Sequence, residues 1–357
     1  MSQSTKKFFP ALTGFRAIAA WMIFVLHFFP FNNPVFPDFI KKFIQEWHIG
    51  VDMFFVLSGF LITYRYFGKK QMNRVEIKNY FVNRFARIYP MYFLVTLGVF
   101  ADFIIRNQYW NREKTIEAII SFTMTKTIFA KYFFTAGISQ GWTLTLEEMF
   151  YFTAPIYFLF IKKHKFWLIV MPVVIFVFGI FLRNISAVPE NTWGFMQKNF
   201  SYYIFEFFAG MFLALVFTGK KNNLKSRGFF TYFGIFSITV YLLLNPFGYS
   251  SPDFIRAAQT ILLAGFGILP LFWGLLCEET FVSKFLSTNL MVLLGKSSYI
   301  FYLIHKGFIP IFIYEFVFPN ILGIFIILNI ISILMFKFLE EPANQWIRKK
   351  YTEKTQK

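Results

Sequence analysis

The sequence predicts an all-α membrane protein, a polytopic helix bundle of about ten transmembrane helices with both termini in the cytoplasm. Of the 357 residues, 57% are hydrophobic, 23% are aromatic and 15% are charged, and the mean hydropathy is +0.53. This composition is far too apolar for a soluble domain. Crossing a bilayer core takes a helix of about 20 mostly apolar residues, and such segments recur along the whole chain.

Ten segments meet that requirement. The predicted spans are residues 10–30, 48–67, 88–106, 142–161, 166–183, 200–218, 229–245, 255–276, 290–315 and 318–338. The stretch 115–135 is moderately apolar but carries Glu117, Lys126 and Lys131, so we expect an interfacial or external segment there. The first apolar stretch is long and lacks a small-residue cleavage site, which predicts a retained span rather than a signal peptide.

The basic residues predict how these spans are oriented. With a cytoplasmic N-terminus, most of the 36 Lys and Arg residues fall in segments predicted to face the cytoplasm. The net charge of +18 is then largely topogenic, and no basic motif indicates nucleic-acid binding. A single cysteine, Cys277, excludes an intrachain disulfide and is expected to pack rather than react. We expect one integral membrane domain over 1–345 and a short basic cytoplasmic tail over 346–357.

Ionisable side chains in the first span predict a polar cavity. Charged groups inside a span are costly and mark candidate sites. Arg16 lies toward the predicted cytoplasmic end and His27 toward the outer end. Eleven residues make about three full turns and rise about 16 Å, so both side chains share one face. Each residue alone is explained by an ordinary anchor or a packing histidine, whereas the shared face favours the cavity.

The second span begins with an acidic residue. Asp52 lies near its predicted outer end, with Ser58 and Gly59 at about mid-depth. Asp52 is equally explained as a favourable charge at a helix N-terminus. Small residues such as Ser58 and Gly59 are typical of close helix packing in membranes.

Further ionisable groups follow in the third, fourth and ninth spans. Arg84 and Arg87 are three residues apart, so one helix turn projects both to one side, either as a topogenic pair or as a phosphate clamp. Glu147 and Tyr151 share a face of the fourth span near its predicted outer end. His305 falls near the middle of the predicted ninth span, where a wet interior is expected. The sequence thus predicts arginines toward the cytoplasmic side of the membrane and imidazole with carboxylates toward its outer side.

Ordered motifs along nearly the whole chain resemble acyltransferase family 3, bacterial membrane proteins that modify surface polysaccharides. LTGFRAIAAWMIFVLHF is similar to the first-span pattern, and GVDMFFVLSGFLIT to the second-span signature. RFARIYPMY, GWTLTLEEMFYF, LGKSSYIFYLIH and the terminal EEP match further elements in the right order. The resemblance is to a form without an extracytoplasmic esterase-like domain, which acts alone or hands the acyl group to a separate periplasmic partner.

The resemblance implies O-acyl transfer from acyl-CoA, commonly acetyl-CoA, to a hydroxyl of a polysaccharide or lipid-linked glycan, with no metal. The expected place is the outer face of the bacterial cytoplasmic membrane. The implied roles are donor phosphate binding by Arg16, Arg84 and Arg87, general base catalysis by His27, orientation of its ring by Glu147 or Asp52, and substrate binding by Trp142, Tyr151, Ser58 and His305. An acyl-histidine, or transfer through Tyr151, is an alternative route to direct transfer.

Two other classes of protein fit part of the pattern. A transporter or flippase of a surface-glycan precursor would also bury charges in a helix bundle. A scaffold subunit that only anchors a soluble acyl-transfer partner would have no need of His27. The ordered motifs, with arginines at one side and histidine and glutamate at the other, favour the enzyme.

Overall fold

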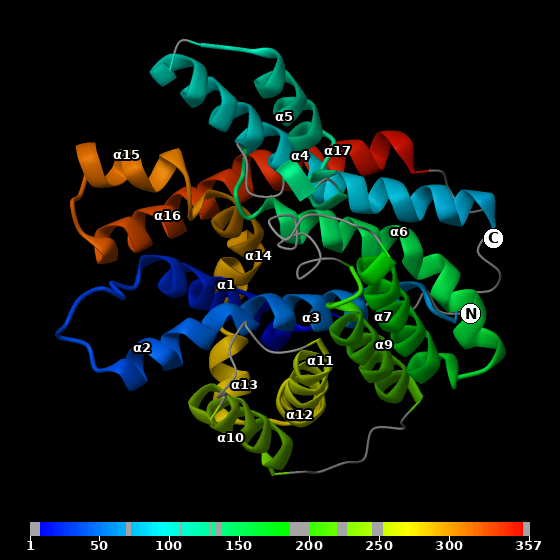
Figure 1. Cartoon of the computed structure of the whole chain (residues 1–357). Helices are drawn as coiled ribbons and strands as arrows, with labels where there is room; N and C mark the ends of the chain where they lie inside the picture. The colour runs from blue at the N-terminus through cyan, green and yellow to red at the C-terminus, as the bar shows by residue number, and fades with distance from the viewer. Residues whose placement is uncertain are drawn as a thin grey trace. The chain divides into compact units, whose positions relative to one another are not determined.

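The computed structural model describes residues 8–68, 73–107, 109–128, 130–132, 137–185, 200–219, 227–244 and 253–352. Every regular element in these residues is helical, which confirms the predicted all-α class (Figure 1). The chain forms two compact units: Met1–Phe67, Tyr157–Ser186 and Ser201–Lys296 make the first, and Gly68–Ile156, Ala187–Phe200 and Ser297–Lys357 the second. The topogenic Lys6 and Lys7, the basic loop 220–226 and tail residues 353–357 lie outside the described residues.

The first unit is a bundle organised around two helices that pack side by side (Figure 1). Its elements are α1 (Pro10–Phe28), α2 (Asp38–Gln45), η1 (Glu46–His48), α3 (Ile49–Tyr66), α7 (Trp167–Ile185), α9 (Ile204–Gly219), α10 (Phe229–Leu244), α11 (Asp253–Leu262), the π-helix η6 (Leu263–Ile268), α12 (Leu269–Cys277) and α13 (Phe281–Leu286). The most extensive helix contact in the described chain joins α3 to α9. Residues of α1, α3, α9, α10, η6 and α12 share one apolar core.

Glycines allow α3 and α9 to approach each other backbone to backbone. A Cβ atom on Gly59 of α3 would lie 2.0 Å from the carbonyl oxygen of Phe207, and one on Gly210 of α9 would lie 1.9 Å from that of Val56. No larger residue fits at either position without moving a helix. The expectation of close packing through small residues at Ser58 and Gly59 is therefore confirmed for Gly59.

The second unit is built on one long helix, α4 (Arg74–Asn107). It also contains α5 (Arg112–Phe122), the short 3₁₀ turns η2 (Lys126–Ile128) and η3 (Ala130–Tyr132), most of α6 (Gly141–Lys163), the end of α14 (Asn289–Ile304), α15 (Phe308–Phe316), α16 (Ile321–Met335), the π-helix η7 (Phe336–Glu340) and α17 (Glu341–Tyr351). Tyrosine hydroxyls fasten α5 to α4: Tyr92 donates to the carbonyl of Ser121 at 2.8 Å and Tyr89 to that of Phe122 at 3.1 Å.

The predicted spans agree with the helices in most places. Within the described residues, six helices are long and apolar enough to cross a membrane. Three shorter apolar helices coincide with the predicted fifth, sixth and seventh spans, and a fourth, Asn289–Ile304, covers only the first part of the predicted ninth span. The helix α5 has 11 residues and is not among them, which is consistent with an interfacial or external segment at 115–135. The predicted third span, 88–106, is the later part of α4, which begins earlier at Arg74.

The prediction of one continuous ninth span over 290–315 is wrong. The helix α14 ends at Ile304 and α15 begins at Phe308. Gly307 between them has φ +104°, a left-handed conformation that glycine adopts readily and that ends the helix. His305 therefore follows the end of α14 instead of lying in the middle of a span. The period of the hydrophobic pattern does not register such a break, because both flanking segments are apolar.

Candidate active site

The helix α1 carries the two residues that first indicated a site. Arg16 is half-buried near its beginning, and His27 is exposed in its last turn. Both lie in one uninterrupted helix, so the predicted shared face and the rise of about 16 Å between them hold in the structure. His27 is thus an imidazole accessible from one end of the first unit, and Arg16 lies toward the other end of its helix.

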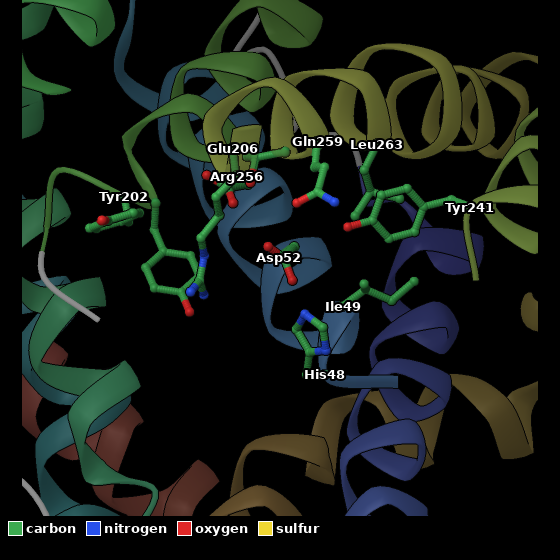
Figure 2. A pocket seen from close by; sticks show the side chains of 11 residues that line it. His48, Ile49, Asp52, Tyr202, Glu206, Tyr241, Arg256, Gln259 and Leu263 are labelled. Atoms are coloured by element: carbon green, nitrogen blue, oxygen red, sulfur yellow. The ribbon is translucent and has the colours of Figure 1, made fainter. Parts of the chain in front are cut away.

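Asp52 is drawn into a polar pocket within the first unit (Figure 2). The side chain is 7% exposed and lies in the first turn of α3, where a carboxylate also interacts favourably with the helix dipole. The lining comes from η1, α3, the turn before α9, α9, α10, α11 and η6. Neither His27 nor Ser58 lines this pocket, so the structure does not bring Asp52 together with them there.

The pocket contains functional candidates that the sequence prediction missed. Glu206, in the first turn of α9, is 1% exposed, and Arg256 reaches the same space from α11. His48, Tyr241 and Gln259 also line it. The signal for Glu206 was present, because it is an ionisable residue inside a predicted span.

In the second unit, Tyr151 ties α6 to α4. Its hydroxyl donates a hydrogen bond to Glu147, one turn earlier on α6, as the predicted i, i+4 spacing requires. The Arg84 guanidinium carbon lies 5.4 Å from the centre of the Tyr151 ring. Tyr80, fully buried on α4, donates to the Tyr151 carbonyl at 2.6 Å. The structure therefore gathers Arg84, Glu147 and Tyr151 into one cluster with both charges close to a single phenol.

Arg87 is engaged with a residue more than 250 positions away in sequence. Its guanidinium forms a hydrogen-bonded ion pair with Glu340, which is 1% exposed in the π-helix η7. A π-helix within an α-helix often marks a functional position, because the extra residue re-aims side chains. Glu340 belongs to the EEP motif, and no pattern in the sequence indicated that it meets Arg87. The pairing fixes the orientation of the guanidinium.

His305 is completely buried at the end of α14, and its Nδ1 lies 2.7 Å from the carbonyl oxygen of Tyr302. Gln140, just before α6, donates to the carbonyls of Tyr302 and Leu303 at 2.9 and 2.7 Å. Thr143 shares a hydrogen bond of 2.9 Å with the Tyr302 hydroxyl. This network binds the start of α6 to the end of α14. Trp142, half-buried on α6, lies between the residues of that network in sequence.

Comparisons with known proteins agree with these motifs. Residues 9–337 match the family model described as "Acyltransferase domain". The chain is 25% identical over 366 residues to Peptidoglycan O-acetyltransferase OatA of Listeria monocytogenes, covering 96% of this chain and 56% of that protein. It is 23% identical over 367 residues to SACOL0978 of Staphylococcus aureus, provisionally named an O-acetyltransferase, covering 94% of this chain and 57% of that protein.

A third relative is similar in length to this chain. ORF330 of Acidianus two-tailed virus, provisionally named an acetyltransferase, is 26% identical over 302 residues, covering 84% of this chain and 83% of that protein. The chain thus spans a little over half the length of the bacterial relatives and most of the viral one. No solved structure matches it. Among the described residues, no group of three or more His, Cys, Asp or Glu side chains could hold a metal ion.

Proposed function

Since the chain belongs to the acyltransferase domain family that its residues 9–337 match, we propose that it is a membrane O-acyltransferase. It takes an acetyl group from acetyl-CoA on the cytoplasmic side of a bacterial cytoplasmic membrane. It passes that group to a hydroxyl of a cell-envelope polysaccharide or lipid-linked glycan near the outer face. The observation that carries the proposal is the family match over nearly all of the helical chain, and the acetyl group and glycan acceptor are taken from the name of the Listeria relative.

His27 is the proposed general base. It takes the proton of the acceptor hydroxyl while the hydroxyl oxygen attacks the thioester carbonyl. A carbon–oxygen bond forms, the carbon–sulfur bond breaks, and the proton passes from the imidazole to the departing thiolate. The exposed position of His27 at the end of α1 supports this role, because a general base must reach the proton that it removes. Glu147 stays the proposed carboxylate that orients the ring, because Asp52 lies in a pocket that His27 does not line.

Arginines are the proposed binding site for the donor's phosphates. Guanidinium groups keep their charge and bind phosphate through two parallel N–H donors. Arg87 keeps its place in the proposed set, and its ion pair with Glu340 holds the guanidinium in one orientation. Arg84 and Arg16 complete the proposed set. Ser58, Trp142, Tyr151 and His305 stay proposed substrate-binding residues, and the domain boundary at 345 stays a proposal.

The first prediction tests the enzyme directly. The purified protein, given acetyl-CoA and cell-envelope glycan, should release CoA and form acetylated glycan. His27→Ala should lower kcat by a factor of about 10² or more, which is the usual contribution of general base catalysis. His164→Ala is the matched control, since His164 lies in the loop between α6 and α7, and it should retain wild-type activity.

Three results would contradict the proposal. If the wild-type protein neither binds nor consumes acetyl-CoA, the chain is not an acyl-CoA-dependent enzyme. If His27→Ala and His164→Ala are equally active, His27 is not the base. Movement of unmodified glycan across sealed vesicles without CoA release would favour a transporter.

A further inference from the structure

The pocket around Asp52 contains buried acceptors that the protein itself does not satisfy. Both carboxylate oxygens of Glu206 and the Oδ2 atom of Asp52 are inaccessible, and no described group donates a hydrogen bond to them. Leaving such groups unsatisfied in a dry interior is unfavourable, because they have lost the hydrogen bonds that water would supply. Proteins tolerate this where a ligand or water completes the site. The pocket is therefore built to receive hydrogen-bond donors.

Asp52 and Glu206 both line this small pocket, so two acidic side chains share one buried space. Adjacent carboxylates repel each other, and a hydrogen-bond donor placed between them stabilises both. Their oxygens are acceptors for any donor that enters the pocket. Figure 2 shows Asp52 in the middle of the lining, with Glu206 and Gln259 above it and His48 below.

The rest of the lining selects the chemical class of the ligand. Arg256 faces the same space as the two acidic groups, so the lining offers both donors and acceptors of hydrogen bonds. An apolar ligand would leave the carboxyl oxygens without donors. A neutral group with several hydroxyls satisfies both sides, because each hydroxyl donates to a carboxylate and accepts from Arg256 or Gln259. The Arg256 guanidinium carbon lies 5.4 Å from the centre of the Tyr202 ring, which holds the cation at the wall of the pocket.

The size and position of the pocket indicate which part of a hydroxyl-bearing ligand can enter it. Its enclosed volume is about 30 Å³, enough for one or two water molecules, so it accepts a hydroxyl-bearing edge of a sugar rather than a whole ring. The lining comes from the beginnings of α3, α9 and α11 and from the later part of α10. The predicted topology assigns all four ends to the outer face, where the acceptor of the proposed reaction is found.

We propose that the pocket lined by Asp52, Glu206, Tyr241, Arg256 and Gln259 binds the hydroxyl-bearing edge of a neutral glycan, as the acceptor subsite of the enzyme. This inference rests on the proposed function for its role in the reaction. The binding itself does not depend on turnover, so it is tested separately. Glu206 and Gln259 are binding residues here, and neither is assigned a part in proton transfer.

The test is the thermal stabilisation of the detergent-solubilised protein by chitotetraose, a neutral oligosaccharide, at millimolar concentration without acetyl-CoA. A ligand that binds only the folded state raises Tm in proportion to its occupancy. The wild-type protein should be stabilised, and Glu206→Gln should lose at least a factor of about ten in affinity, as expected for a hydrogen bond to a charged group. Glu279→Gln, an exposed glutamate in the same unit, should respond like the wild type.

Each outcome decides the matter. No stabilisation of the wild-type protein, equal stabilisation of Glu206→Gln, or equal stabilisation by glycerol overturns the proposal. If Glu206→Gln does not fold, Gln259→Ala carries the same test, since Gln259 is half-buried on α11. In the turnover assay, Glu206→Gln should raise the KM for the glycan about tenfold or more. The same substitution should change the KM for acetyl-CoA by less than about twofold. Sugar binding without consumption of acetyl-CoA would sink the proposed function and leave this site standing.

Discussion

Two regions of the molecule bury acidic side chains in opposite ways. In the first unit, Glu206 and Asp52 have buried carboxyl oxygens to which no described group donates a hydrogen bond. In the second unit, Glu340 is just as buried, but one of its oxygens accepts from Arg87. The Arg87–Glu340 pair is thus neutralised by the protein itself. The carboxyl groups of the pocket gain a hydrogen-bond donor only when a ligand or water enters it.

The difference separates a buried carboxyl group that the protein pairs from two that it leaves without a donor. A buried ion pair needs both partners to offset the loss of hydration. A buried carboxyl pair that lacks donors lowers stability, and it is retained in a protein that uses it. Burial alone therefore does not identify a functional residue among the many ionisable groups of these spans. The informative observation is whether the buried group already has its partner.

The largest expected effect comes from breaking the Arg87–Glu340 pair. Glu340→Met leaves the guanidinium without its counter-ion and should lower the free energy of unfolding by about 3 kcal/mol. The double variant Arg87→Met/Glu340→Met should recover most of that loss, because two apolar residues replace two charges. Thermal unfolding in detergent measures both variants. If the double variant is as unstable as Glu340→Met, the stability that Glu340 contributes does not come from its ion pair with Arg87.

This pair also shows how far the sequence could predict the structure. Hydrophobic segments of about 20 residues predicted the helical spans, since each span satisfies its own backbone and depends little on its neighbours. The i, i+4 contact of Glu147 with Tyr151 followed from helix geometry in the same way. The meeting of Arg87 with Glu340 depends on tertiary packing across 253 positions, and no local pattern encodes it.

The site was predictable to a similar extent. Asp52 stood out as a charge at the start of a span, and the structure does place it in a pocket. Its neighbours Glu206 and Arg256 come from helices distant in sequence, so their convergence required the fold. His305 was misplaced because a turn at Gly307 interrupts an apolar stretch without changing its hydropathy.

A second prediction concerns Lys126, a buried cation of the second unit outside the spans. It is 1% exposed, its Nζ donates to the Ile138 carbonyl at 3.2 Å, and burial lowers its pKa from 10.5 to about 8 against the opposing effect of Glu117. The folded state therefore disfavours the charged lysine. Burial of the charged lysine lowers the free energy of unfolding by its full amount below about pH 8 and has no effect above about pH 10.5. Stability should therefore rise with pH between these two values.

Lys126→Met removes the charge and should stabilise the protein at pH 7 by up to about 3 kcal/mol, the equivalent of the pKa shift. The Ile138 carbonyl keeps a donor, because Gly141 N–H also bonds to it at 2.9 Å. The advantage should shrink toward zero near pH 10.5. Unfolding followed at both pH values tests this, and an advantage independent of pH would mean that packing, not charge, is responsible.

The matched control for Lys126 is Lys131, whose side chain is 67% exposed and pairs with Glu113 at 2.7 Å. The Glu113 carboxylate raises the pKa of Lys131, the reverse of the effect of burial on Lys126. An exposed ion pair contributes little to stability, because water and salt screen both charges. Lys131→Met should therefore leave stability nearly unchanged.

The smallest expected change in stability tests how the pocket is held together. A methyl group added by Gly210→Ala would lie 1.9 Å from the Val56 oxygen and 2.7 Å from the Phe60 nitrogen, so α3 and α9 must separate. Such overpacking costs about 1–3 kcal/mol. Because Asp52 lies on α3 and Glu206 on α9, the same displacement should also abolish stabilisation by chitotetraose.

Gly219→Ala provides the comparison on the same helix, since nothing lies within 4 Å of the added methyl group. This variant should keep both wild-type stability, within about 1 kcal/mol, and the response to the sugar. Thermal unfolding with and without chitotetraose measures both quantities for the two variants. If Gly210→Ala loses stability but still responds to the sugar, the carboxyl pair tolerates movement of its helices. Sugar binding by the acidic pocket would then depend on which side chains line it and not on the exact spacing of α3 and α9. The Arg87–Glu340 ion pair differs, because it needs its two side chains at hydrogen-bond distance.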